Sequence, residues 1–140
     1  MTEEYRLNPY LTVSDAAGAI DFYGKAFGAT EITRMPAQDG KRLMHAEIKV
    51  NGAYVMLSDE FPEFAKNSAP VRAPTAENPA GVGIVVHYKT PAEVDNIYAR
   101  AVDAGCASIM VPEDTFWKAR FAAIRDPYGH RWMFNAPLAQ

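Results

Sequence analysis

The sequence predicts an α+β fold in which a unit of one strand, one helix and three further strands occurs twice. Two segments have helical spacing of apolar residues with clear end signals, and two others alternate apolar and polar residues around a tight turn. The two halves also superpose when one is shifted along the other. With 140 residues, 49% hydrophobic and 22% charged, the chain has the size and composition of one folded domain, residues 1–140.

The first helix is expected from about Asp15 to Phe27. Ser14 or Asp15 can cap its start, because a side-chain oxygen there accepts a hydrogen bond from a free backbone amide. Apolar residues recur at intervals of three and four, and Gly28 can close the end in a left-handed conformation. The segment therefore predicts a helix with one buried face.

The second helix has a fuller start signal. Thr90 is its expected N-cap, Pro91 takes the first helical position, and Glu93 stands where a capping box places its carboxylate. An apolar stripe follows, and Gly105 ends the helix. Cys106 then enters a strand, which favours a buried, unreactive thiol.

Two hairpins are predicted where the apolar period changes to two. Residues 42–50 alternate apolar with polar side chains, Asn51-Gly52 supplies a tight turn, and residues 54–58 return as the partner strand. The same layout recurs near the end of the chain in residues 120–125, 126–129 and 131–135.

The two halves match in chemistry as well as position. A shift of 75 residues superposes the helices and a shift of 77 superposes the hairpins. The matched pairs include Tyr23 with Tyr98, Ala26 with Ala101, Gly52 with Gly129 and Met56 with Met133. An internal repeat is the favoured interpretation, and chance similarity of two helix-plus-hairpin segments is the alternative.

The repeat sets the expected organisation of the chain. Module one is expected over about residues 5–60 and module two over about 82–136. Residues 61–81 between them contain four prolines and show no periodicity. Long segments of this kind within a compact domain are usually lids or linkers, and both fit here.

Charge and cysteine content exclude several classes of partner. The net charge is −3 and no run of Lys or Arg occurs, so binding to nucleic acid or to an anionic membrane is not expected. The single cysteine cannot form an internal disulfide. Residues 1–5 lack the features of a signal peptide, and no apolar run approaches the ~20 residues of a membrane helix. A cytoplasmic location is therefore expected.

Five stretches, taken in order, carry a resemblance to a known family. They are residues 8–15 (NPYLTVSD), 22–29 (FYGKAFGA), 44–47 (MHAE), 56–60 (MLSDE) and 126–132 (DPYGHRW). Together they resemble the vicinal oxygen chelate superfamily of glyoxalases, bleomycin resistance proteins and dioxygenases, and within it the PhnB-like branch. The resemblance implies two βαβββ modules whose curled mixed sheets surround a cavity, commonly in a homodimer. It leaves the function open, because the superfamily includes metal enzymes and metal-free binding proteins.

The resemblance also places metal ligands at four positions, one on the first and one on the last strand of each module. Here these positions hold Asn8, Met56, Gly83 and Met133. An amide oxygen is a weak ligand, a thioether suits soft ions, and glycine has no side chain. We therefore expect the usual metal site to be absent, and no cofactor is expected.

In a curled sheet, strand alternation predicts which side chains face the cavity. The candidate ligand-binding residues are Tyr10, His45, Glu47, Tyr54, Met56, His87, Phe116, Trp117, Arg120 and Met133. His45 and Glu47 project to the same side of one strand and are the candidate catalytic residues. They can act as a proton acceptor, bind a displaced metal together with His87, or form a structural hydrogen bond.

Several polar or aromatic residues have two interpretations. Phe116 and Trp117 can stack on a flat ligand at the cavity mouth or fill space under a loop. Arg120 can steer a carboxylate or phosphonate into the cavity, or pair with Asp114 or Glu47. His130 is expected to be an exposed turn residue. The acidic residues Asp59, Glu60 and Glu63 are expected to form a solvated loop edge.

The first functional hypothesis is a metal-independent small-molecule-binding protein, sequestering a toxic or antibiotic compound. The alternative is a small-molecule lyase, isomerase or transferase that uses His45 and Glu47 as acid and base or as ligands of a relocated metal. A third class is an oligomerising structural domain, which a cavity filled by side chains would favour.

Overall fold

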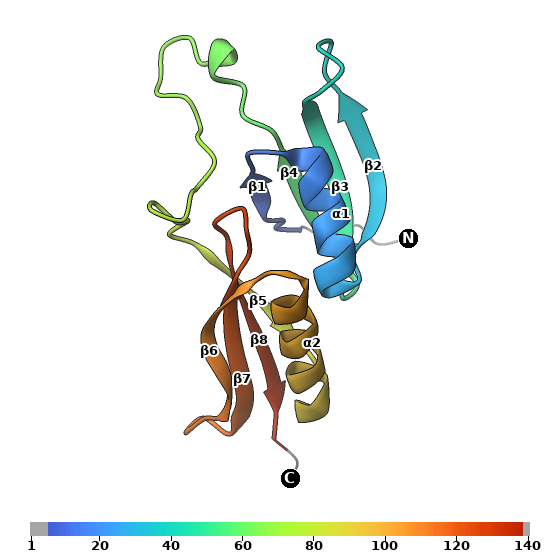
Figure 1. Cartoon of the computed structure of the whole chain (residues 1–140), viewed down its shortest axis with the longest axis vertical. Coiled ribbons are helices and arrows are strands. Elements are labelled where there is room, and N and C mark those ends of the chain that lie inside the picture. The colour runs from blue at the N-terminus through green and yellow to red at the C-terminus, as the bar shows by residue number, and fades with distance from the viewer. Residues whose placement is uncertain (1–5, 139–140) are drawn as a thin grey trace.

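The computed structural model describes residues 6–138 and contains two four-stranded mixed sheets, each covered by one helix on one face (Figure 1). The first module comprises β1 (Tyr10–Thr12), α1 (Ala16–Phe27), β2 (Thr30–Pro36), β3 (Leu43–Val50) and β4 (Ala53–Ser58). The second comprises β5 (Gly83–His87), α2 (Pro91–Ala104), β6 (Ala107–Asp114), β7 (Ala119–Arg125) and β8 (Arg131–Pro137). Between them lies a short 3-10 helix, η1 (Pro62–Phe64).

The predicted α+β fold of two βαβββ modules is confirmed. The sheet orders are β1-β4-β3-β2 and β5-β8-β7-β6, so both modules have one topology. In each, the strand before the helix pairs in parallel with the last strand, and the other pairs are antiparallel. The modules lie end to end, with α1 and α2 in contact on one side (Figure 1).

The local signals place the helices correctly. Asp15 is the N-cap of α1, since its carboxylate accepts a hydrogen bond from the Gly18 amide, and Gly28 closes the helix with φ of 69°. Thr90 and Glu93 form the predicted capping box of α2. Periodicity does not locate β2 and β6, because β2 is exposed at every residue and both strands contain register shifts. An edge strand of this kind buries neither face and so loses the period of two.

A buried carboxylate connects the two modules. Asp126, which is 3% exposed, accepts hydrogen bonds from the Tyr23 hydroxyl of α1 at 2.6 Å and from the Trp132 indole of β8 at 2.8 Å. The backbone amides of Tyr128 and His130 donate to its other oxygen. Burial, and then the Asp126 charge, raise the pKa of Tyr23 well above 10.0, so this hydroxyl remains a donor. The contact fixes α1 of one module on the last hairpin of the other.

His130 differs from its predicted exposed position. It is buried, and its Nε2 lies 3.0 Å from the Thr12 carbonyl oxygen of β1. The second hairpin turn therefore packs against the first strand of the chain. From the sequence alone a turn residue is expected to be exposed. The strand that contacts His130 lies more than a hundred residues away, so the sequence pattern does not indicate the contact.

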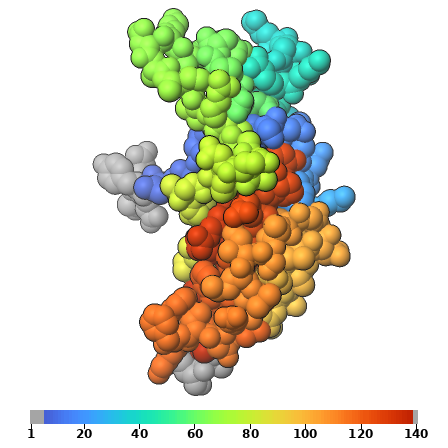
Figure 2. Space-filling view, turned by 60° about the vertical axis from the view of Figure 1, so that its left-hand side comes forward, coloured from blue at the N-terminus to red at the C-terminus, as the bar shows by residue number. Residues whose placement is uncertain are grey.

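The connector, residues 61–81, follows both modules. Near its end, the Ala80 amide donates to the Gly129 carbonyl at 3.0 Å, and Pro74 packs so closely on Gly129 that a Cβ there would lie 2.9 Å from the proline. Figure 2 shows this yellow-green part of the connector lying against the red second hairpin. The connector thus crosses the junction between the modules.

Two predictions about the start of the chain fall on residues that the structure does not describe. The prediction of no signal peptide concerns residues 1–5, and the expected start of module one falls at the edge of that segment; both lie outside the described residues. Within residues 6–138, no helix has the length and apolar character that a membrane span requires.

Replacing Asp126 with Asn tests the contact between the modules. The amide has one acceptor oxygen where the carboxylate has two, and its NH2 group would face two donors. We expect the free energy of unfolding to fall by about 2–4 kcal/mol, measured by urea titration with circular dichroism. Asp103→Asn, on the exposed side of α2, is the matched control and should change stability by less than about 0.5 kcal/mol. Equal stability of the two variants would contradict this role.

Candidate functional site

The face of the first sheet that points away from α1 carries the polar side chains of the candidate site. Leu11, Ala46 and Leu57 are buried on the helix side, so their neighbours along each strand face the other way. The residues on this open face are Tyr10 and Thr12 from β1, His45 and Glu47 from β3, and Tyr54, Met56 and Ser58 from β4. Alternation therefore places these side chains on one face of the sheet, as predicted from the strand pattern.

Tyr10, His45 and Glu47 form a hydrogen-bonded chain on this face. The Tyr10 hydroxyl lies 2.9 Å from Nδ1 of His45, and Nε2 of His45 lies 2.9 Å from Oε2 of Glu47. The rings of Tyr10 and His45 are 5.5 Å apart, centre to centre. The predicted proximity of His45 and Glu47 is present, and Tyr10 adds a third group that reaches across β4 from β1.

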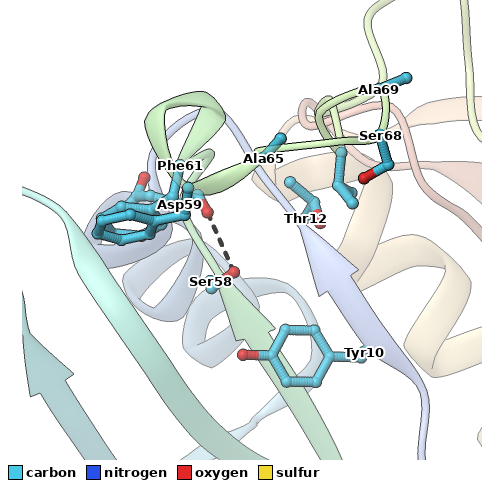
Figure 3. A pocket seen from close by; sticks show the side chains of 10 residues that line it. Tyr10, Thr12, Ser58, Asp59, Phe61, Ala65, Ser68 and Ala69 are labelled. Atoms are coloured by element: carbon cyan, nitrogen blue, oxygen red, sulfur yellow. Dashed lines mark hydrogen bonds between the residues drawn. The ribbon is translucent and has the colours of Figure 1, made fainter.

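The connector covers one end of this face and forms one side of an open pocket of about 450 Å³, which we call the connector pocket. Figure 3 shows Tyr10, Thr12 and Ser58 on the sheet side and the connector residues Phe61, Ala65 and Ser68 opposite or beside them. The full lining is Tyr10, Thr12, Ser58, Asp59, Phe61, Phe64, Ala65, Ser68, Ala69 and Val71. The sheet side is polar and the connector side mostly apolar.

A second hollow, of about 330 Å³, also borders the sheet. It is lined by Tyr10 and Thr12 on the sheet side and by Arg72, Ala73, Pro74, Asn78, Pro79, Ala80 and His130. Tyr10 and Thr12 are common to both hollows. Tyr10 therefore lies at the point where the two meet.

Arg42 holds the start of the connector. Its guanidinium donates to both carboxylate oxygens of Glu63, at 2.5 and 3.1 Å, and to the Glu60 carbonyl at 3.0 Å. It also lies 4.2 Å from the ring centre of Phe61, which stacks on Phe64. The same guanidinium lowers the pKa of Glu63. Arg42, the residue directly before β3, thus holds the aromatic wall of the connector pocket in place.

Asp59 differs from the predicted solvated acidic edge. It is 6% exposed and accepts hydrogen bonds from the backbone amides of Ala16 at 2.9 Å and Leu43 at 2.6 Å. These contacts tie the end of β4 to the first residues of α1 and β3. The position of an acidic residue directly after an apolar strand is the one sequence signal for this buried role. Its two partners are distant in sequence, so the signal does not identify them.

The four positions at which the resemblance places metal ligands do not fit a divalent ion. The Asn8 amide nitrogen already donates to the Tyr54 carbonyl at 3.2 Å. A Cβ on Gly83 would lie 2.6 Å from the terminal methyl of Met133, so that methionine fills the space of the missing side chain. Met56 offers only a thioether, which hard divalent ions bind poorly. This donor set carries no metal-dependent step.

The alternative ligand set for a relocated metal does not assemble within the chain. Across the described range 6–138, no three His, Cys, Asp or Glu side chains are grouped so that they could hold an ion. His87 lies at the end of β5, where its carbonyl accepts a hydrogen bond from Asn51 and its ring lies 3.4 Å from Asn135. His87 and Tyr54 line a separate hollow of about 390 Å³ at the first hairpin turn.

Arg120 differs from its predicted inward orientation. It pairs with Ala136, a buried residue of β8 on the helix side, and its guanidinium binds Asp95 of α2 at 2.9 Å and Asp114 at 3.1 Å. The alternative of pairing with Asp114 is the one observed. The neighbouring Phe121 lies on the open face instead, beside Asn135.

The predicted aromatic pair lies at the other end of the molecule. Phe116 and Trp117 occupy the turn between β6 and β7, at the lower end of the second module (Figure 1). Trp117 packs edge-on against Phe121 with ring centres 5.7 Å apart, whereas Phe116 is 93% exposed. Neither residue lines the connector pocket. Met133 is also in the second sheet, next to Val85 on its open face.

Comparisons with known proteins agree with this architecture. The family model of the Glyoxalase/Bleomycin resistance protein/Dioxygenase superfamily matches residues 6–134. An uncharacterized protein of Mycobacterium bovis is 39% identical over 137 residues, covering 98% of this chain and 86% of that protein. TioX from Micromonospora superposes with a TM-score of 0.73 at 23% identity, covering 95% of this chain and 98% of TioX. A PhnB protein from Bacillus cereus gives 0.67 at 18%, covering 96% and 100%.

Replacing Arg42 with Ala tests what holds the connector. The change removes the ion pairs to Glu63 and Asp39 and the contact with Phe61. We expect amide hydrogen exchange in residues 60–71 to rise by about threefold or more, because local opening becomes easier. Global stability should change little, since these ion pairs are exposed. Arg34→Ala, which removes an exposed pair with Glu31 on β2, is the control and should leave residues 60–71 unchanged. Unaltered exchange in Arg42→Ala would contradict the assignment.

Proposed function

The chain belongs to the glyoxalase/bleomycin resistance protein/dioxygenase superfamily, and from this premise we propose that it is a metal-independent small-molecule-binding protein that sequesters a toxic or antibiotic compound. The observation that carries the proposal is the donor set at the expected metal positions, Asn8, Met56, Gly83 and Met133, which contains no His, Asp or Glu. A member of the superfamily with this set has to use its cavity without the usual ion.

The connector pocket supports the proposal. Its volume of about 450 Å³ falls in the range of roughly 300–1,000 Å³ typical of small-molecule sites. Phe61, Phe64 and Val71 offer an apolar wall, while Tyr10 and Ser58 offer hydroxyl groups. This combination suits a compound with an apolar body and an oxygen that takes part in hydrogen bonds. An open pocket also counts against the purely structural role.

The proposal includes a second copy of the chain and a cytoplasmic location. Val85, Met110 and Trp117, in the second sheet and at its β6–β7 turn, are between 40% and 51% exposed, which supports a homodimer that covers them. The single cysteine is buried, and burial raises its pKa to about 12, so it stays an unreactive thiol.

Metal content and ligand binding test the leading proposal. Protein purified without chelator or affinity metal should contain no near-stoichiometric metal by elemental mass spectrometry, in wild type and in His45→Ala alike. A thermal-shift screen should then find a stabilising compound. Phe61→Ala should weaken its binding by about 5- to 30-fold, because one aromatic wall is lost. Phe116→Ala, exposed and outside the pocket, should leave binding unchanged.

Two results would contradict the leading proposal. A stoichiometric metal in wild type that disappears in His45→Ala would indicate a relocated metal site. Equal binding by Phe61→Ala and wild type would place the ligand elsewhere. Light scattering on the same samples measures the assembly, for which we expect a dimer.

A second candidate function is a small-molecule lyase, isomerase or transferase. The contact of 2.9 Å between His45 and Glu47 favours it, because a carboxylate bonded to one ring nitrogen fixes the orientation and tautomer of a histidine that exchanges protons through the other. A relocated metal at His45 is less favoured, since both ring nitrogens already have hydrogen-bond partners.

Replacing His45 with Ala tests this second candidate. With a compound from the ligand screen that the protein converts, turnover should fall by about 10²–10⁴-fold while the circular dichroism spectrum stays that of wild type. Lys49→Ala, two residues beyond Glu47 on β3, is the control and should keep full turnover. Unchanged turnover in His45→Ala would remove His45 from the mechanism.

A further inference from the structure

Tyr10 combines two properties that no other residue of the open face shares. Its hydroxyl ends the hydrogen-bonded chain through His45 to Glu47, with both contacts at 2.9 Å. It also lines the connector pocket and the neighbouring hollow, whereas His45 and Glu47 line neither. In this chain, a ligand in the pocket therefore meets the histidine and the carboxylate only through the tyrosine.

We propose that Tyr10 is a catalytic acid–base residue, activated by His45 and Glu47, that exchanges a proton with a small carbonyl compound held in the connector pocket. The proposal rests on the small-molecule pocket of the proposed function and adds a reaction to it. His45 and Glu47 are then positioning residues that act through Tyr10, in contrast to a mechanism in which His45 touches the substrate.

The hydrogen-bond chemistry fixes the direction of the chain. An ionised Glu47 has only acceptor oxygens, so Nε2 of a neutral His45 carries the hydrogen that bridges them. Nδ1 of the same ring is then unprotonated and accepts a hydrogen bond from the Tyr10 hydroxyl. The chain thus places a base directly behind the phenol, with the carboxylate holding the base in this tautomer.

The proton transfers balance within the hydrogen-bonded chain of Tyr10, His45 and Glu47. When the Tyr10 oxygen takes a proton from a carbon next to the carbonyl of the ligand, its own proton passes to Nδ1 of His45. The resulting imidazolium is stabilised by the Glu47 carboxylate, and the ligand becomes an enolate. The reverse transfer returns the proton to the ligand at the same or at another atom. A tautomerisation of this kind needs no oxidant, reductant or second substrate.

The surroundings of Tyr10 suit this role. Tyr10 is 51% exposed and lines the connector pocket, so its side chain is open to a ligand there, while the side chains of His45 and Glu47 are 26% and 27% exposed. The connector wall, including Phe61 and Phe64, offers an apolar surface to the body of a bound ligand.

Tyr54 provides a matched comparison within the same sheet. It lies on the same open face, on β4, and within residues 6–138 its hydroxyl has no hydrogen-bond partner. Its ring contacts the Lys49 ammonium at 5.2 Å instead. Tyr54 is therefore a half-buried tyrosine without a base behind it.

Acetylation by N-acetylimidazole at neutral pH tests the activation without any ligand. The Tyr10 oxygen attacks the acetyl carbon, its proton passes to His45 and then to the departing imidazole, and the product is acetyl-tyrosine. Peptide mass spectrometry over time gives the rate at each tyrosine. We expect Tyr10 to react at least about tenfold faster than Tyr54, because its oxygen gains a general base.

Two variants distinguish activation from exposure. His45→Gln keeps a hydrogen-bonding side chain but removes the base, so the rate at Tyr10 should fall by about tenfold from its wild-type value, while the rate at Tyr54 stays constant. Glu47→Gln should lower the Tyr10 rate to an intermediate value. An unchanged rate at Tyr10 in His45→Gln would overturn the proposal.

A measurement on the wild-type protein keeps the test independent of variant folding. The ¹⁵N chemical shifts of His45 should show the tautomer protonated at Nε2, and the tautomer protonated at Nδ1 would overturn the proposal. Failure of the ligand screen with fast acetylation of Tyr10 would reject the proposed function and leave the activated tyrosine in place. Ligand binding together with slow acetylation of Tyr10 would support the proposed function and reject the activated tyrosine.

Discussion

The buried carboxylate of Asp126 accepts four hydrogen bonds, and its donors come from both modules. The Tyr128 and His130 amides and the Trp132 indole belong to the second module, and the Tyr23 hydroxyl of the first completes the set across the junction. Once α1 supplies the Tyr23 hydroxyl, the second hairpin has a fixed place against the first module. The position of that hairpin then decides where His130 meets β1 and where the connector can cross the junction.

The candidate site depends indirectly on the position of the second hairpin. The connector begins at contacts made by Asp59 and Arg42 within the first module and ends on Gly129 of the second hairpin. These two attachments hold the connector at both of its ends. The pocket is therefore a product of tertiary structure, although its floor, with Tyr10 and Ser58, consists of side chains that strand alternation alone selects.

Local signals explain what the sequence predicts well. Caps and apolar spacing locate both helices, and an alternation of two residues places His45 and Glu47 on one side of β3. The orientation of Arg120 depends instead on the register of the second hairpin. In this register Arg125 pairs with Arg131, and Arg120 therefore pairs with Ala136. The Arg120 side chain thus lies on the same face of the sheet as the buried Ala136. Turn composition does not specify that register. The contact between Tyr10 and His45 could not be predicted from sequence either, because it spans β4, which lies between β1 and β3.

The packing of Met133 on Gly83 has a consequence for how this position can accept a mutation. A Cβ at position 83 would meet the terminal methyl of Met133 at 2.6 Å, whereas its next neighbours, atoms of Arg131, lie at 3.6 Å, an ordinary contact distance. That methyl is the far end of a flexible side chain, so a change of its rotamer relieves the contact without a shift of the backbone. The two positions are therefore coupled through one movable side chain, and a substitution at position 83 would be read out as a new orientation of Met133.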